Sequence, residues 1–331
     1  MEKELTIQKE INSNYYEVAP GVWGMTDFFV NIYMISNPVD DSWVLIDSGL
    51  KTSGPKIKKM ALQLFGEKKP SEIILTHGHF DHVGSLSYLL EEWNVPVYAH
   101  YLEIPFLTGR SSYPPPDPTV GGGLLSLMSF LYPNAPINIW NKINVLPEGG
   151  SVPGLTEWQY ILTPGHSPGH ISLYRETDGV LIAGDAFVTT QQESFFSVLF
   201  QNKKISGPPK YFTYDWEQAR QSLKILMKLE PEIIAAGHGK PMHGKEVRRS
   251  LHHLSEQFHK IAVPSYGRYV ESPAVADATG IVYIPPTNIN KRNLVLKALT
   301  LTMALSLSYV LLHQKRKKIK KNKEVLSYEI W

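Results

Sequence analysis

The sequence predicts a mixed α/β fold. Apolar β-type runs alternate with stretches of helical apolar spacing along most of the 331 residues. Glycine and metal-capable side chains stand where several of these runs end. With 43% hydrophobic and 19% charged residues, the composition is that of a globular protein long enough to bury a large core.

The composition excludes several kinds of chemistry. The chain has no cysteine, so disulfides, thiolate zinc ligands and a cysteine nucleophile are excluded. Its net charge of +2 gives no argument for a nucleic-acid partner, and none is expected. Residues 1–14 carry charges of both signs without an apolar run, which predicts a flexible leader, no secretory signal and a cytoplasmic location.

The stretch from Ile73 to Trp93 combines a short strand, a polar loop and an amphipathic helix. Its sequence is IILTHGHFDHVGSLSYLLEEW, with a β-type run over 73–75 and apolar residues at helical spacing from Val83. Between them stand four metal-capable side chains, His77, His79, Asp81 and His82. Imidazole and carboxylate suit Zn²⁺ and other first-row metals. This density predicts metal binding rather than a turn that happens to be rich in histidine.

The remaining elements follow from similar signals. Further strands are predicted at 22–26, 28–35, 43–47, 97–99, 141–146, 157–162, 171–174, 180–183 and 233–236, with helices at 56–65, 215–229 and 244–261. Asp215 is the expected N-cap of the second of these helices. Asp47 ends a strand and precedes Ser48-Gly49. It is either a turn residue or a hydrogen-bond acceptor that orients a ligand histidine. His100 ends another strand and is expected to cap or pack.

Metal-capable residues recur at strand ends beside glycine. His166 follows a strand in the loop Thr163-Pro164-Gly165-His166, Asp185 follows Gly184, and His238 lies between two glycines. Strand ends that meet at one edge of packed sheets would gather these side chains with His77, as a rigid metal site requires.

Two irregular stretches interrupt this pattern. Residues 104–136 are rich in proline and glycine and carry an apolar run over 124–132, and residues 187–214 are rich in aromatic side chains. Insertions of this kind often cover a site. Tyr211 and Tyr214 are candidates for polarising a substrate carbonyl, although packing explains them equally well. Residues 263–293 are expected to form an irregular extension.

These motifs, in this order, resemble the metallo-β-lactamase superfamily: His-x-His-x-Asp-His, then Pro-Gly-His, Gly-Asp and Gly-His, with Asp47 matching an early motif. The resemblance implies a four-layer αβ/βα sandwich and a catalytic domain over residues 15–262. It assigns the first metal to His77, His79 and His166, and the second to Asp81, His82 and His238, with Asp185 bridging. Asp47 then orients a ligand histidine. His170 is expected to support the ligands or to be structural, rather than to bind a metal itself. The other histidines, at 243, 252, 253, 259 and 313, are expected at the surface or in packing.

The charge balance of such a centre predicts hydrolysis. Two divalent ions, most simply Zn²⁺ with Fe or Mn as alternatives, would be offset only by Asp81 and Asp185, which we take as the catalytic carboxylates. A metal can lower the pKa of its water from about 15.7 to about 7, so that a metal-bound hydroxide can attack directly. The second ion would stabilise the developing oxyanion.

The resemblance also narrows the reaction. Redox di-iron members carry glutamate where this chain has His79, and nuclease members usually add a cap domain or basic arm. Lactonases and glyoxalase II-like thioester hydrolases share the motifs seen here. We therefore expect a small-molecule ester, lactone or thioester with a hydrophobic portion as the substrate. A phosphodiesterase or nuclease is the alternative, and a non-enzymatic metal-stabilised scaffold is a third interpretation.

The C-terminal part differs from the rest. Residues 294–312 carry one charge, Lys297, and seven Lys and Arg residues follow over 315–323. The length permits a membrane span, but a positive tail should stay cytoplasmic, which conflicts with a span that places the catalytic domain outside. An interfacial helix with a polybasic tail on anionic lipid, through residues 294–323, avoids this conflict. An ordinary packed helix with a basic tail over 294–331 is the other interpretation.

Overall fold

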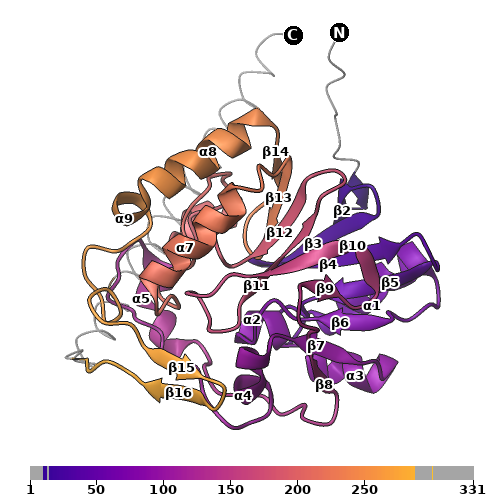
Figure 1. Ribbon diagram of the computed structural model, residues 1–331, viewed down its shortest axis with the longest axis horizontal. Helices are drawn as coiled ribbons and strands as arrows, with labels where there is room; N and C mark the ends of the chain where they lie inside the picture. Colours follow the sequence, from indigo (N-terminus) through magenta and orange to yellow (C-terminus); the bar gives the residue numbers. More distant parts are fainter. Residues whose placement is uncertain (1–9, 13–14, 288–299, 301–331) are drawn as a thin grey trace, which may run out of the picture. The chain divides into compact units, whose positions relative to one another are not determined.

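The computed structural model describes residues 10–12, 15–287 and 300. The chain divides into two units, Met1–Thr287 and Asn288–Trp331. The described part of the first unit contains two large sheets, a separate hairpin and the helices that cover them (Figure 1). Apart from residue 300, the second unit lies outside the described residues, and so does the segment predicted to meet a membrane. Among the residues that the structure describes, no helix has the length and apolarity needed to cross a bilayer.

The first sheet has eight strands in sequence order. They are β1 (Glu10–Asn12), β2 (Tyr15–Ala19), β3 (Val22–Asp27), β4 (Val30–Asn37), β5 (Ser42–Ile46), β6 (Glu72–Ile74), β7 (Val97–Ala99) and β8 (Ile143–Val145). Neighbours from β1 to β5 are antiparallel, whereas β5 to β8 are parallel and are joined by helical crossovers.

The second sheet has six strands in the order β14-β13-β12-β11-β10-β9. Their bounds are β9 Ser151–Val152, β10 Leu155–Leu162, β11 Ile171–Arg175, β12 Val180–Gly184, β13 Ile233–Ala236 and β14 Met242–His243. Because β11 is antiparallel to both β10 and β12, and β12 is parallel to β13, strands β10, β12 and β13 all end at the same edge. The loops that carry His166, Asp185 and His238 leave the sheet at that edge.

The helices are mostly short. In chain order they are α1 (Gly54–Phe65), α2 (Phe80–Val83), α3 (Leu86–Trp93), η1 (Tyr101–Glu103), α4 (Ile104–Leu107), α5 (Leu124–Leu127), η2 (Ser129–Leu131), α6 (Phe195–Leu199), α7 (Trp216–Met227), α8 (Lys245–Glu256) and α9 (Phe258–Ile261). Asp215 caps α7 by accepting a hydrogen bond from the Gln218 backbone nitrogen, as its sequence position predicts.

Three buried clusters define four layers and confirm the predicted αβ/βα sandwich. Ile57 of α1 and Leu86 of α3 pack on one face of the first sheet. The two sheets pack against each other through a second cluster that includes Ile46 and Ile182. Helices α7 and α8 cover the outer face of the second sheet through side chains such as Leu223 (Figure 1). The hydrophobic effect of burying these apolar faces holds the two βα halves together.

The structure differs from the sequence predictions in several places. Strands β2, β9 and β14 were not predicted, and residues 10–12 of the expected leader pair with β2. The helix expected from Val83 is divided at Gly84-Ser85 into α2 and α3, because the Gly84 position lies against the backbone of the Gly49–Lys51 loop. The helix predicted at 244–261 breaks at Gln257.

The irregular stretches contain more regular structure than expected. The 104–136 segment holds α4, α5 and η2, and the 187–214 segment holds α6. The extension after residue 263 includes an antiparallel hairpin, β15 (Val275–Asp277) and β16 (Gly280–Tyr283), so residues 275–283 are not irregular. Most side chains of these two short strands are exposed, so the sequence shows no clear apolar pattern there.

Candidate metal centre

The loop after β6 carries four of the predicted metal ligands. His77 follows Thr76 in the loop after β6, and His79 occupies the N-cap position of α2 in extended backbone with φ −66° and ψ 153°. Asp81 and His82 lie one and two residues into that helix. The change from extended to helical backbone directs the two pairs of side chains to different positions, and all four are buried.

The other three predicted ligands come from the shared edge of the second sheet. His166 follows β10, Asp185 follows β12 and His238 follows β13. Glycine is required where these loops meet. A Cβ atom at Gly237 would lie 2.1 Å from Oδ1 of Asp185, and Gly184 has φ +52° with only 2.5 Å between its Cβ position and the His170 ring. All of these ligand side chains are buried.

Metal-capable atoms gather in three overlapping groups, each with all its atoms within 4.8 Å of one another: His77, His79 and His166; His77, His82 and Asp185; and Asp81, His82 and His238. Oδ2 of Asp185 lies 3.5 Å from Nε2 of His166, 3.0 Å from Nε2 of His238 and 3.7 Å from Nε2 of His82. This carboxylate therefore lies between two groups of imidazoles.

Hydrogen bonds at the far nitrogens orient three of the imidazoles. His82 donates from Nδ1 to Asp47 across 2.8 Å, and His238 donates from Nδ1 to the carbonyl of Phe29 across 2.6 Å. Nδ1 of His77 lies 3.1 Å from the Thr76 hydroxyl, which itself donates to Asp47. Because Nδ1 of each ring is engaged in this way, Nε2 is the nitrogen that faces the cluster and can bind a metal once it is deprotonated.

Several buried atoms of the cluster have no hydrogen-bond partner among the described residues. They are Nε2 of His77, Nε2 of His82, Nδ1 of His166 and Oδ1 of Asp185. Buried polar atoms without partners are costly and rare. Most of these atoms belong to the groups that could hold a cation, and imidazole with carboxylate is the donor set of zinc and related metals. The residues present therefore fit a divalent metal pair.

The protonation of the cluster differs between its two halves. Burial lowers the pKa of His77 and His166 well below the usual range and that of His79 to about 3, so these rings are neutral. Burial also lowers the pKa of His82, but Asp47 and Asp185 outweigh it and hold the net pKa well above its usual value. The pKa of Asp185 is raised by burial and lowered more strongly by His238 and His82, so it is a carboxylate.

Asp47 and His170 form hydrogen bonds with candidate ligands or with the backbone beside them. Asp47 accepts from the Thr76 backbone nitrogen and hydroxyl, both at 2.7 Å, as well as from His82. It has φ +61°, an uncommon conformation for a residue with a Cβ atom. Nε2 of His170 accepts from the Asp185 backbone nitrogen at 2.8 Å, and its Nδ1 lies 2.8 Å from the Thr163 hydroxyl. Both residues thus contact the segments that carry the candidate ligands.

Glu103 was not singled out from the sequence, although the structure places it between the two histidine loops. Its carboxylate accepts from the backbone nitrogens of Gly78 (2.9 Å) and Gly169 (2.7 Å). It also accepts from the hydroxyls of Ser167 (2.8 Å) and Tyr113. Burial raises the pKa of Glu103. The one sequence signal was an acidic residue directly before the apolar run Ile104-Pro105-Phe106-Leu107.

Aromatic side chains from three segments pack beside the cluster. We call them the aromatic wall: Phe80, Tyr132, Tyr211 and Phe212. The ring of Phe212 stacks on His79 with centroids 4.6 Å apart, and Tyr211 contacts Tyr132 edge-on at 5.5 Å. Burial and then the charge of Asp81 raise the pKa of Tyr132 to about 12. Tyr132 comes from the 104–136 insertion and Tyr211 from the 187–214 stretch, so both stretches contribute to the aromatic wall.

The two candidate tyrosines have different surroundings. Burial, Tyr132 and Asp81 raise the pKa of Tyr211 well above its usual value, whereas Tyr214 is affected by burial, Glu103 and Asp215. Tyr214 packs with Tyr269. Of the two, Tyr211 is the one on which a candidate ligand, Asp81, acts electrostatically.

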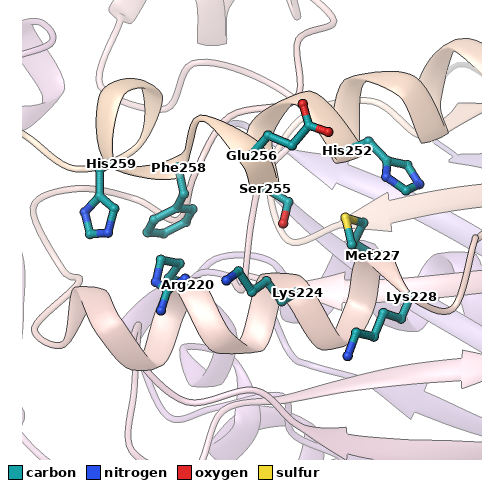
Figure 2. Close-up of a pocket in the computed structure, with 9 residues that line it drawn as sticks. All are labelled: Arg220, Lys224, Met227, Lys228, His252, Ser255, Glu256, Phe258 and His259. Atoms are coloured by element: carbon teal, nitrogen blue, oxygen red, sulfur yellow. The ribbon is translucent and has the colours of Figure 1, made fainter.

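A surface pocket of about 400 Å³ lies between α7 and α8 (Figure 2). Figure 2 shows Arg220, Lys224 and Met227 facing residues of α8 and α9 across it. Two of its charged side chains are paired, Arg220 with Glu217 and His252 with Glu230. The remaining histidines at 243, 253 and 259 are exposed, as predicted, and His313 lies outside the described residues. His100 caps η1 by accepting from Leu102, also as predicted.

Comparison with known proteins agrees with this geometry. Residues 25–238 match the model of the metallo-β-lactamase superfamily. The chain is 47% identical over 248 residues to a probable metallo-hydrolase, YflN of Bacillus subtilis, covering 74% of this chain and 94% of that protein. It is 25% identical over 211 residues to a hydroxyacylglutathione hydrolase of Idiomarina loihiensis, covering 61% of this chain and 66% of that enzyme.

The fold is also found among solved structures. An archaeal metallo-β-lactamase superfamily protein from Sulfolobus tokodaii aligns with a TM-score of 0.50, covering 85% of this chain and 96% of the archaeal chain. Their sequences are 17% identical, so this similarity establishes the fold alone. The family match spans the strands and loops that build the cluster. The chain therefore belongs to the metallo-β-lactamase superfamily and is a metal-dependent hydrolase.

Proposed function

We propose that this hydrolase cleaves an ester, lactone or thioester with a hydrophobic portion at a centre of two divalent ions. The first ion would be held by His77, His79 and His166, the second by Asp81, His82 and His238, with Asp185 between them. When bound, two such ions supply a water of lowered pKa and a positive charge for the developing oxyanion. Zn²⁺ fits the donor set best, with Fe or Mn as alternatives.

The chain's own residues supply position and charge. Asp47 and the Phe29 carbonyl fix the orientation of His82 and His238. Asp81 and Asp185 provide the only carboxylates in the three metal-capable groups of the described residues, so they offset part of the cationic charge. His170 fixes the backbone at Asp185 through its hydrogen bond. These contacts hold the ligands in place, so that the centre needs little rearrangement during reaction.

The aromatic wall carries the proposal for the substrate. It stacks directly on His79 through Phe212, so an apolar group bound against it would lie beside the reacting centre. Burial of apolar substrate surface against aromatic side chains stabilises binding and excludes water. The similarity to a hydroxyacylglutathione hydrolase supports an acyl substrate.

Tyr211 is the tyrosine that we assign to the substrate carbonyl. Its raised pKa keeps the phenol protonated at neutral pH, so it remains a hydrogen-bond donor. A neutral donor beside the centre can stabilise oxyanion charge without adding a formal charge of its own. Tyr214 is buried against Tyr269 and Ala274, and we assign it a packing role.

A substrate panel tests this proposal. Purified protein with two ions per chain would be assayed with p-nitrophenyl esters of increasing acyl length, a matched series of lactones, acyl thioesters and bis(p-nitrophenyl) phosphate. We expect kcat/KM to rise with acyl length in at least one carboxylic series. Preferred cleavage of the phosphodiester would support the phosphodiesterase alternative and overturn the proposal.

A variant of the wall separates substrate binding from chemistry. Phe212→Leu keeps an apolar side chain but removes the ring that stacks on His79. The variant should lose the dependence of KM on acyl length while keeping its metal content. Phe106→Leu is the matched control, because Phe106 is also buried but stacks on Tyr113 instead. An unchanged length dependence in the Phe212 variant would remove the wall from the proposal.

A further inference from the structure

The helix α6 exposes an unusual set of apolar side chains. Phe195, Phe196, Leu199 and Phe200 are 39%, 44%, 55% and 63% exposed, and we call them the α6 apolar face. Phe196 and Phe200 stack with centroids 6.4 Å apart, so the rings form one surface. Single exposed apolar residues are ordinary, but a contiguous group on a helix of five residues marks an interaction site.

The sequence that carries this face has charged side chains of one sign only. Residues 194–204 contain no acidic residue, and Lys203 and Lys204 lie four and five residues after the end of α6. Both lysines are exposed, and neither has an ion-pair partner among the described residues. Glu193, which precedes the helix, is buried and accepts a hydrogen bond from the Lys210 backbone nitrogen.

The size of the face decides against a second copy of the chain as its occupant. Aromatic side chains bury about 150–250 Å² each, so the exposed fractions amount to roughly 400 Å². A stable interface buries about 800 Å² on each partner. Anionic lipid needs no such area, because a few inserted aromatic side chains and nearby lysines act together at a membrane surface.

We propose that the α6 apolar face docks on the surface of an anionic phospholipid bilayer, with Lys203 and Lys204 at the headgroups. The helix is connected to the metal centre. The Thr190 hydroxyl donates to the Ser197 carbonyl in α6, and Thr189 donates to the His238 carbonyl through both its backbone nitrogen and its hydroxyl, at 3.1 Å each. Docking would thus bring an amphiphilic substrate beside the catalytic edge. In this respect the inference extends the proposed function, although the docking itself does not require turnover.

The absence of cysteine allows a direct test on the full chain. A polarity-sensitive fluorophore would be attached to Leu199→Cys on α6, or to Leu62→Cys on α1 as the matched control, since Leu62 is 52% exposed. Both would be titrated with vesicles of phosphatidylcholine containing 30% phosphatidylglycerol and with vesicles of phosphatidylcholine alone. We expect a blue shift at position 199 only, only with the anionic vesicles, and weaker at high salt.

Unlabelled variants measure the contribution to binding. Phe195→Ser with Phe200→Ser should lower the vesicle partition coefficient at least about tenfold, because two exposed rings leave the interface. Trp140→Ser is the matched control, since Trp140 is 73% exposed at another place and should leave partition unchanged.

The possible outcomes distinguish a membrane from a second copy of the chain as the partner of the α6 apolar face. Vesicle binding without a shift at position 199 would assign membrane contact to another part of the chain and overturn the proposal. A shift that appears without vesicles and rises with protein concentration would identify a second copy and also overturn it. Because no outcome depends on turnover, failure of the proposed hydrolytic function would be seen separately in the substrate panel.

Discussion

Nδ1 of His82 donates a hydrogen bond to Oδ2 of Asp47 across 2.8 Å. The same carboxylate oxygen accepts from the Thr76 hydroxyl, whose oxygen lies beside Nδ1 of His77. One aspartate thus orients candidate ligands of both proposed metals. Hydrogen-bond partners of metal ligands typically contribute about 10–100-fold to metal affinity or activity.

Replacing Asp47 should therefore weaken the second metal most. In Asp47→Ala, His82 loses the acceptor that fixes its tautomer, and we expect a fall in metal affinity of roughly 10–100-fold, with a parallel fall in activity. Metal content after dialysis, measured by mass spectrometry, checks this. Asp27→Ala is the control, since Asp27 is also buried but binds Ser53 and Lys56. Equal losses in both variants would mean general destabilisation.

Glu103 should matter to the centre without touching it. Its carboxylate joins the His77–His79 loop to the His166 loop through Gly78, Ser167 and Gly169. Glu103→Gln replaces one acceptor oxygen with a donor amide, so about 1–3 kcal/mol of unfolding free energy should be lost in urea. We also expect a lower kcat at saturating metal. Glu193→Gln, which removes another buried carboxylate, should lose stability but keep the kcat of the unaltered enzyme.

The two halves of the centre should release metal at different pH. Asp47 and Asp185 hold the pKa of His82 above its usual value, so its ring keeps a proton at higher pH and competes with a cation as pH falls. Burial holds the pKa of His79 at about 3, so that ring stays neutral from pH 8 to pH 5. On acidification the second ion should leave first, giving a plateau near one ion per chain.

Metal analysis of protein dialysed at stepped pH measures this plateau. In His238→Ala the second set of ligands is incomplete, so the content should stay near one ion per chain across the same range. Simultaneous loss of both ions from the unaltered chain would contradict the assignment of His82 to a second, more acid-sensitive set.

Tyr211→Phe should reduce kcat about hundredfold or more, because it removes the proposed donor to the carbonyl oxygen. The ring and its contacts with Tyr132 and Phe212 would remain, so KM for long acyl chains should change little. Tyr214→Phe is the internal comparison and should retain most activity. Similar kinetics for the two variants would mean that Tyr211, like Tyr214, serves only in packing.

Features that depend on residues close together in the chain could be predicted from the sequence. Apolar runs beside glycine located β6, β10, β12 and β13, and the superfamily assignment and sandwich are confirmed. The short strands β9 and β14 were missed because two residues give no periodic signal. Glu103 was missed for another reason: its partners Gly78 and Gly169 are distant in sequence, and only tertiary packing brings them to one carboxylate.

Metal stoichiometry against activity tests the central claim most directly. Chelated protein would be reconstituted with Zn²⁺ in steps, with bound ions counted by mass spectrometry and hydrolysis measured at each step. We expect activity to follow occupancy of the second ion and to reach its maximum at two per chain, while Asp185→Ala, which removes the carboxylate between the two groups, stays inactive. Full activity at one ion or fewer per chain, or in the Asp185 variant, would contradict the account.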